Sequence, residues 1–304
     1  MSPVGVTVAR MAPVLTSPVV SAQWLADHLG ADDLTIVDAT VLVDLGLDGD
    51  ADHASVAYAT GRDGFERDGH VPGAVLADLV AEFSDPDSGL PFTRPGAARF
   101  QAAVAALGVS NDSTVVVYDT VDGRWASRLW WLFRAYGHDA VAVLDGGWSQ
   151  WLAHGKPYDL GRTEPVPARF AATERPEHWV DKAFVESVLA GDERATLVSG
   201  SPRDEFDGTS SRLPRAGHIP GSVNVPAETL LADDGTLARE PVLRDRLAVV
   251  PDEPRTVVYC ATGVSASVDA LALAVLGRSG VSVYDGSLSE WVADPAAPLL
   301  PAAA

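Results

Sequence analysis

Short runs of apolar, mainly β-branched residues alternate along the chain with longer segments of helical periodicity. Such alternation is typical of a parallel β-sheet covered by helices, and it predicts an α/β fold. In the first half the pattern predicts a strand over 34–38, a helix over 95–107, a strand over 114–118, a helix over 126–136 and a strand over 140–144. In the second half it predicts a strand over 196–198, a strand over 255–259, a helix over 267–276 and a strand over 281–284.

Three sequence landmarks occur twice in the same order, which indicates that one domain has been duplicated. The two copies are separated by 140 to 148 residues. The matched segments are 69–75 (GHVPGAV) with 217–223 (GHIPGSV), 116–119 (VVYD) with 257–260 (VVYC), and 143–147 (VLDGG) with 283–287 (VYDGS). We therefore expect two tandem domains, each a mainly parallel sheet with helices on both faces.

The limits of the two domains follow from local composition. The segment 156–181 is rich in proline, glycine and charged residues, and it is predicted to be a linker. Residues 1–20 are interrupted by prolines and lack the pattern of a secretory signal, so they are predicted to be a disordered leader. The first domain is accordingly placed at 21–155 and the second at 182–302.

The overall composition restricts the partners and the location of the protein. The 304 residues carry a formal net charge of −20, spread along the chain, which disfavours nucleic acid and anionic membranes as partners. No segment reaches the roughly 18 apolar residues of a membrane span, and a single cysteine excludes an internal disulfide. We expect a cytoplasmic protein that concentrates positive charge locally wherever it binds a small anion.

Cys260 stands at the end of a predicted buried strand, before a glycine-containing loop and an apolar helix. In open α/β sheets, ligands bind where the carboxyl ends of strands lead into helix N-termini. Backbone N–H groups and the helix dipole stabilise a thiolate there, and the thiolate is the nucleophilic form of cysteine. Gly263 permits the positive φ of a tight loop. Cys260 is therefore predicted to be a nucleophile, the alternative being an inert cysteine packed as a small apolar residue.

Three motifs of the second half together resemble those of tandem-domain rhodaneses and 3-mercaptopyruvate sulfurtransferases. They are GHIPG at 217–221, YCATGVSA at 259–266 and DGSLSEW at 285–291. With the matching landmarks of the first half, the resemblance covers nearly the whole chain. It implies two rhodanese-like domains, with the active site in the second domain near the interface between the two.

The resemblance also implies sulfur transfer through a cysteine persulfide. Cys260 would take sulfane sulfur from a small donor, 3-mercaptopyruvate or thiosulfate, and pass it to a thiol or to cyanide, with no metal or organic cofactor. Backbone N–H groups of the loop would hold the persulfide anion, and the loop residues are Ala261, Thr262, Gly263, Val264 and Ser265. Because none of these carries positive charge, we expect a preference for 3-mercaptopyruvate over the dianion thiosulfate.

The first copy has Asp119 at the position that corresponds to Cys260. A carboxylate cannot carry sulfane sulfur, and the resembled family commonly contains one silent domain. The first domain is therefore predicted to be catalytically silent, with Asp119 in a supporting role.

An anionic donor is expected to require an arginine, because a guanidinium pairs with a carboxylate in a bidentate manner. The resembled family usually carries Asp-x-Arg after the first strand of the second domain, but Ser199 and Ser201 stand here. Arg203, two residues further on, and Arg128, after the silent loop, are therefore the candidate anion-binding residues. Two further arginines precede the second Gly-His turn, Arg212 and Arg215.

Two other functions were weighed against sulfur transfer. Phosphatases with this fold need an arginine six positions after the nucleophile. This chain has Ala266 at that position, so a phosphatase function is disfavoured. A degenerate rhodanese pair that acts as a binding or regulatory module is the main alternative, because the Asp-x-Arg is absent. The presence of the only cysteine at the loop position favours the enzyme.

Overall fold

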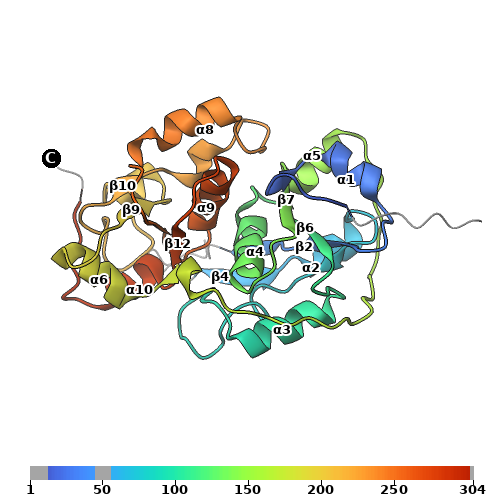
Figure 1. Cartoon of the computed structure of the whole chain (residues 1–304), viewed down its shortest axis with the longest axis horizontal. Coiled ribbons are helices and arrows are strands. Elements are labelled where there is room, and N and C mark those ends of the chain that lie inside the picture. The colour runs from blue at the N-terminus through green and yellow to red at the C-terminus, as the bar shows by residue number, and fades with distance from the viewer. Residues whose placement is uncertain (1–12, 45–55, 302–304) are drawn as a thin grey trace, which may run out of the picture.

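The computed structural model describes residues 13–44 and 56–301, and each half of the chain forms a five-stranded parallel sheet (Figure 1). Across the first sheet the strands are β1 (Val19–Val20), β7 (Val141–Leu144), β6 (Thr114–Tyr118), β2 (Leu34–Asp38) and β5 (Val75–Leu76). Across the second they are β8 (Trp179–Val180), β12 (Val281–Tyr284), β11 (Thr256–Tyr259), β9 (Thr196–Ser199) and β10 (Val223–Asn224). The two strand orders match position by position, as duplication predicts.

The central strands were predicted correctly to within two residues, whereas the short edge strands were not predicted. A strand of two residues shows no alternation that a sequence pattern could reveal. An antiparallel pair in the first domain, β3 (Val41–Asp44) with β4 (Ala57–Thr60), was also not predicted.

Two of the edge strands lie outside the sheet-forming regions expected from the sequence. Within the predicted leader 1–20, Val19 pairs with Val143 of β7, so the first sheet begins before residue 21, and residues 1–12 lie outside the described part. Within the predicted linker 156–181, β8 pairs with β12 and completes the second sheet. Short apolar segments are thus ordered by the edge of a neighbouring strand rather than by their own periodicity.

Helices cover both faces of the first sheet. Because side chains alternate along β6, Val116 and Tyr118 face one layer while Val115 and Val117 face the other. The first layer consists of α1 (Ala22–His28), α2 (Arg62–Arg67) and α5 (Gly147–Ala153). The second layer consists of α3 (Ala97–Ala106) and α4 (Arg124–Ala135).

The second sheet is covered in the same way. Its outer face packs against α6 (Lys182–Ala190) and α10 (Ser287–Ala293). Its other face packs against α8 (Glu240–Arg246) and α9 (Ala266–Val275). The remaining helical segments are short, namely α7 (Arg203–Phe206), η1 (Pro176–His178), η2 (Ala227–Leu230) and η3 (Leu247–Val249).

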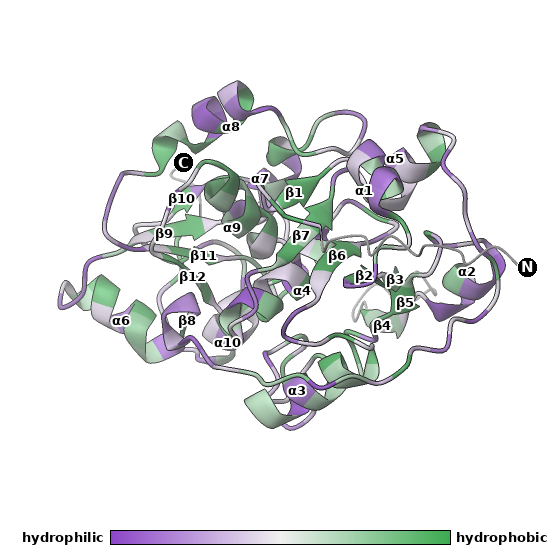
Figure 2. Ribbon diagram, turned by 45° about the vertical axis from the view of Figure 1, so that its right-hand side comes forward, coloured by the Kyte–Doolittle hydropathy of each residue, from purple (hydrophilic) through white to green (hydrophobic). Residues whose placement is uncertain are grey.

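The two domains pack through α4 and α9, which lie side by side in the middle of the molecule (Figure 1). Buried residues of both helices belong to one continuous hydrophobic core that reaches the inner faces of both sheets. The central strands β6 and β7 are mainly hydrophobic (Figure 2). The interface is therefore fixed by a shared core, and this positions the loops that precede α4 and α9 next to each other.

Matching tertiary hydrogen bonds confirm the internal repeat. The Tyr118 hydroxyl accepts a hydrogen bond from the backbone N–H of Val71 at 3.2 Å, and the Tyr259 hydroxyl accepts one from Ile219 at 3.2 Å. In each domain this bond fastens the Gly-His turn to the strand that leads into the candidate loop. Among the described residues, no helix is long and apolar enough to cross a membrane.

Candidate active site

Cys260 directly follows β11 and is 3% exposed. Gly263 in the following loop has a φ of 75°, as the sequence predicted. The segment that leads into α10 supports the loop from behind. The backbone N–H of Leu288 donates to the Cys260 carbonyl at 3.0 Å, and that of Ser289 donates to the Ala261 carbonyl at 2.9 Å. The cysteine is thus held at the carboxyl edge of the second sheet.

The loop after Cys260 has a series of unused hydrogen-bond donors. Within the described part of the chain, the backbone N–H groups of residues 261–265 donate to no other group. Buried N–H groups are nearly always paired in folded proteins. Gly263 and Val264 are buried and the other three residues are half-buried, so these five donors, which we call the cradle, are chemically suited to an anion.

The corresponding loop of the first domain has the same kind of cradle, but it is filled. One carboxylate oxygen of Asp119 accepts from the N–H groups of Val121 and Gly123, at 2.8 and 3.0 Å. The other accepts from Trp125 and Ala126, at 3.0 and 2.9 Å. Burial raises the pKa of Asp119, and these backbone hydrogen bonds oppose the rise. The occupied cradle supports the prediction that this domain is silent.

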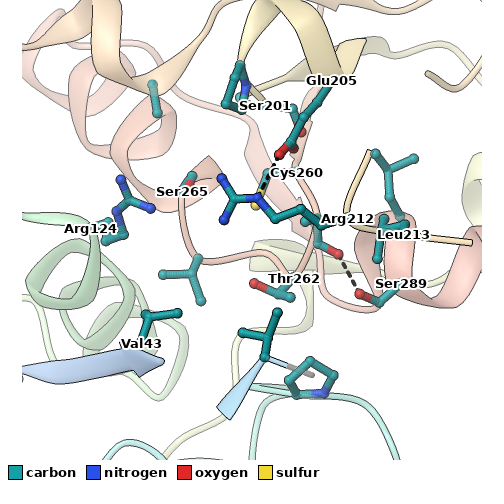
Figure 3. Close-up of a pocket in the computed structure, with 18 of the residues that line it drawn as sticks. Val43, Arg124, Ser201, Glu205, Arg212, Leu213, Cys260, Thr262, Ser265 and Ser289 are labelled. Carbon is teal, nitrogen blue, oxygen red and sulfur yellow. Dashed lines mark hydrogen bonds and ion pairs between the residues drawn. The ribbon is translucent and has the colours of Figure 1, made fainter. Parts of the chain in front are cut away.

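Cys260 borders a cavity of about 370 Å³ between the two domains (Figure 3). The four loop residues Ala261, Thr262, Val264 and Ser265 line it, whereas Gly263 does not. Ser201, which stands where the resembled family has arginine, is buried and also lines it. The first domain contributes Tyr58, Asp122, Arg124 and Trp125, and the second adds Glu205, Arg212 and Arg215.

The two arginines suggested by the sequence do not reach this cavity. Arg128 is 1% exposed, and its guanidinium pairs with Asp285 at 2.7 Å, donates to the Phe92 carbonyl and lies over the ring of Trp179. Arg203 points to solvent and pairs with Asp207 at 2.7 Å. Arg128 is fully engaged at the domain interface and Arg203 lies outside the lining, so neither is placed to bind a donor anion.

Arg128 instead connects the silent domain to the candidate loop. Its Nη1 lies 3.5 Å from the carbonyl oxygen of Gly263, in the loop that follows Cys260. Asp285, its ion-pair partner, also accepts a hydrogen bond from the backbone N–H of Arg94 at 2.9 Å. This buried network fixes the Cys260 loop relative to the first domain.

Arg212 and Arg124 are the arginines with unused donors in the cavity, among the residues that the structure describes. Arg212 pairs with Glu205 at 3.2 Å, and both line the same cavity as Cys260 (Figure 3). Arg124 pairs with Asp122 and enters from the α4 side. Arg215 also lines the cavity, but its guanidinium donates to the backbone carbonyls of Asp294 and Ala297.

The sequence analysis noted Arg212 without selecting it and did not consider Arg124 or Glu205. Burial raises the pKa of the Glu205 carboxyl, Arg212 opposes that rise, and Asp204 and Glu228 add to it. A partly buried carboxylate paired with a cation, in the lining of a cavity that Cys260 also lines, is characteristic of a functional site. Nothing in the local sequence indicates that a residue of the silent loop faces the second domain.

Comparison with known proteins identifies the family. A family model described as "Rhodanese-like domain" matches residues 21–154 and 186–294. The chain belongs to the rhodanese family. Its two matches agree with the internal repeat, and they confirm the predicted α/β fold with two tandem rhodanese-like domains.

Relatives of this rhodanese are sulfurtransferases. The chain is 36% identical to 3-mercaptopyruvate sulfurtransferase of Homo sapiens, covering 92% of this chain and 93% of that one. It is 36% identical to thiosulfate sulfurtransferase of Gallus gallus, covering 73% and 78%. The crystal structure of SseA from Escherichia coli, described with the 3-mercaptopyruvate sulfotransferases, superposes with a TM-score of 0.76 at 32% identity, covering 90% and 99%. The assignment of the chain as a sulfurtransferase is confirmed.

Proposed function

We propose that this rhodanese transfers sulfur through a persulfide on Cys260. The observation that carries the proposal is the cradle of five unpaired N–H groups around the only cysteine of the chain, at the wall of the cavity. Such donors stabilise the thiolate that attacks the sulfur donor and the thiolate that is released when the acceptor takes the sulfur. The proposal is supported by the first domain, where the loop at the matching place holds the Asp119 carboxylate through four backbone N–H groups.

With 3-mercaptopyruvate as donor, the Cys260 thiolate attacks the sulfur atom of the substrate. A sulfur–sulfur bond forms, the carbon–sulfur bond breaks, and its electron pair leaves on carbon as the enolate of pyruvate, which then takes a proton. The enzyme is left as Cys260–S–SH. A thiol or cyanide then removes the outer sulfur and regenerates the thiolate.

We further propose that 3-mercaptopyruvate is preferred to thiosulfate. The loop from Ala261 to Ser265 has no charged side chain to neutralise a compact dianion next to the attacked sulfur. The carboxylate of 3-mercaptopyruvate is separated from its sulfur, so Arg212 can pair with it from outside the loop. Arg212 lines the cavity from the second domain and is paired with Glu205, a contact that a substrate carboxylate could replace.

Steady-state kinetics with each donor and a common thiol acceptor test this preference. We expect a several-fold higher kcat/KM for 3-mercaptopyruvate, and Arg212→Met should raise the KM for this donor about tenfold through loss of a charged hydrogen bond. Arg203→Met is the matched control, because Arg203 has a similar ion pair outside the cavity. A clear preference for thiosulfate would refute the donor assignment. Absence of turnover with any donor would favour the binding-module alternative.

The cytoplasmic location predicted from the sequence is retained as part of the proposal. It is supported by the chemistry of a free nucleophilic thiol, which persists most readily in a reducing compartment. Fractionation of cells that produce the protein, followed by detection with an antibody, would test it.

A further inference from the structure

The silent domain contributes a cation to the cavity in front of Cys260. Arg124 is the first residue of α4, and it directly follows the loop that begins after Asp119. The N–H groups of Gly123 and Trp125, on either side of Arg124, both donate to the Asp119 carboxylate. The backbone of Arg124 is therefore fixed by the same carboxylate that makes this domain unable to carry sulfur.

The side chain of Arg124 is oriented but not saturated. Its Nε donates to both carboxylate oxygens of Asp122, at 2.7 and 2.9 Å, and its Nη2 donates to the same group. Its Nη1 has no hydrogen-bond partner within the described residues, and the side chain is 41% exposed. A planar guanidinium held along one edge presents its other edge to a ligand.

Arg124 lies within electrostatic range of the reacting sulfur. Hydrogen bonding to Asp122 raises the pKa of Arg124, burial opposes the rise, and the negative charges of Asp122 and of a Cys260 thiolate add to it. Figure 3 shows Arg124 entering from α4, on a different side of the cavity from Arg212. The cavity thus has cations from both domains, Arg124 from the first and Arg212 and Arg215 from the second, and the guanidinium of Arg215 is bonded to backbone carbonyls.

The proposed cycle places the donor and the acceptor at different distances from Cys260 Sγ. In the donor step, Cys260 Sγ itself contacts the substrate sulfur. In the acceptor step, the incoming thiol attacks the outer sulfur of the persulfide, which stands about 2 Å beyond Sγ. The acceptor therefore lies one sulfur atom further into the cavity than the donor. A donor carboxylate needs one guanidinium, which Arg212 supplies from the domain that carries Cys260.

We propose that Arg124 binds the anionic group of the sulfur acceptor, so that the enzyme favours small thiols that carry a carboxylate or a sulfonate. This inference rests on the proposed persulfide cycle. The acceptor thiolate attacks the outer sulfur, the bond to Sγ breaks, and its electron pair returns to Cys260 as the thiolate. The proton stays on the transferred sulfur, and the acceptor leaves as its own persulfide, R–S–SH.

The test compares acceptors with wild-type enzyme and Arg124→Met at saturating 3-mercaptopyruvate. The anionic acceptors are 3-mercaptopropionate and 2-mercaptoethanesulfonate, and 2-mercaptoethanol is the neutral one. Cyanide is a second control, because it has no anionic group apart from its reacting atoms. Taking the ratio of variant to wild-type kcat/KM for each acceptor removes differences in intrinsic thiol reactivity.

We expect kcat/KM to fall about tenfold for the anionic thiols, as for loss of a charged hydrogen bond, and to change less than about twofold for 2-mercaptoethanol and cyanide. Arg124→Lys should retain part of the preference. The rate of sulfur loading onto Cys260 without acceptor should be unchanged. Arg67→Met is the matched control, because Arg67 makes a similar bidentate pair with Asp68 at 2.9 and 3.0 Å on an exposed helix of the same domain.

Three results would overturn the inference. An equal loss for all acceptors would indicate a general disturbance of the site, and an unchanged kcat/KM for the anionic thiols would show that Arg124 does not bind them. Slower sulfur loading with normal acceptor kinetics would assign Arg124 to the donor. If the wild-type enzyme forms no persulfide, the proposed function itself fails. If the persulfide forms and any of the three results above is found, only the inference about Arg124 fails.

Discussion

Glu205 and Arg212 hold each other in the free enzyme, and this pair lies where the donor carboxylate is proposed to bind. Their side chains are 3.2 Å apart at the cavity wall, and burial raises the pKa of Glu205. An incoming carboxylate must therefore compete with Glu205 for the guanidinium. Glu205 therefore controls how readily Arg212 can pair with the carboxylate of the substrate.

Replacing this carboxylate by an amide should strengthen donor binding. We expect Glu205→Gln to lower the KM for 3-mercaptopyruvate about two- to fivefold, the range of a partly exposed ion pair. Glu193→Gln, at an exposed position remote from the cavity, is the control. An unchanged or higher KM in the Glu205 variant would show that the carboxylate does not compete with the donor.

The competition between Glu205 and the donor carboxylate for Arg212 also predicts how the KM for 3-mercaptopyruvate changes with pH. As the pH falls toward the raised pKa of Glu205, the wild-type carboxylate takes up a proton and releases Arg212. The KM of the wild-type enzyme should therefore fall with decreasing pH by more than that of Glu205→Gln. Measuring both KM values across the acidic range tests this, and parallel curves would argue against it.

At the scale of elements, the loops after β6 and β11 stand at matching places in the two sheets and differ in what their N–H groups contact. In the first loop four N–H groups converge on the Asp119 carboxylate, and in the second the N–H groups of 261–265 remain open beside Cys260. A loop that converges several N–H groups at a helix start requires an anion, because unpaired buried donors are costly. Asp119 serves as that anion in the silent domain.

Removing the Asp119 carboxylate should therefore affect stability more than chemistry. We expect Asp119→Ala to lower the free energy of unfolding by about 2 kcal/mol, because buried N–H groups lose their acceptor while the cost of burying a charge is regained. Asp119→Asn keeps one oxygen acceptor and should lose less. Urea denaturation measures both effects, and an unchanged midpoint in the Ala variant would contradict the filled-cradle account.

The catalytic consequence of the Asp119 change is separable from its effect on stability. Below the temperature at which Asp119→Ala unfolds, sulfur loading from 3-mercaptopyruvate should stay close to wild type. A loss as complete as that of a Cys260 variant, with the fold intact, would show that the first loop takes part in the chemistry.

At the scale of the whole molecule, the candidate active site is a product of domain docking. One hydrophobic core joins the inner faces of both sheets through α4 and α9, and the buried pair of Arg128 with Asp285 crosses the interface. The cavity is therefore lined by both domains. In a chain with a net charge of −20, the three arginines of the cavity lining offset its three carboxylates, Asp122, Glu205 and Glu228, so anionic substrates meet a locally balanced site.

The parts of this architecture that depend on local pattern could be predicted from the sequence. The duplication, the central strands and the position of Cys260 at a strand end follow from periodicity and repeated motifs. The site arginines could not be predicted in the same way. Arg124 faces Cys260 only because α4 docks against α9, and Arg128 was misjudged because its burial depends on the same docking. Contacts between domains leave no periodic signal in either one.

The central claim is that Cys260 carries the transferred sulfur, and intact-protein mass spectrometry tests it most directly. After incubation with 3-mercaptopyruvate and removal of excess donor, the wild-type protein should gain the mass of one sulfur atom, which added cyanide or thiol removes. Cys260→Ser should gain nothing, because a hydroxyl does not hold sulfane sulfur and the substitution preserves the fold. Absence of the added sulfur on the wild-type protein, or equal gain by Cys260→Ser, would contradict the account.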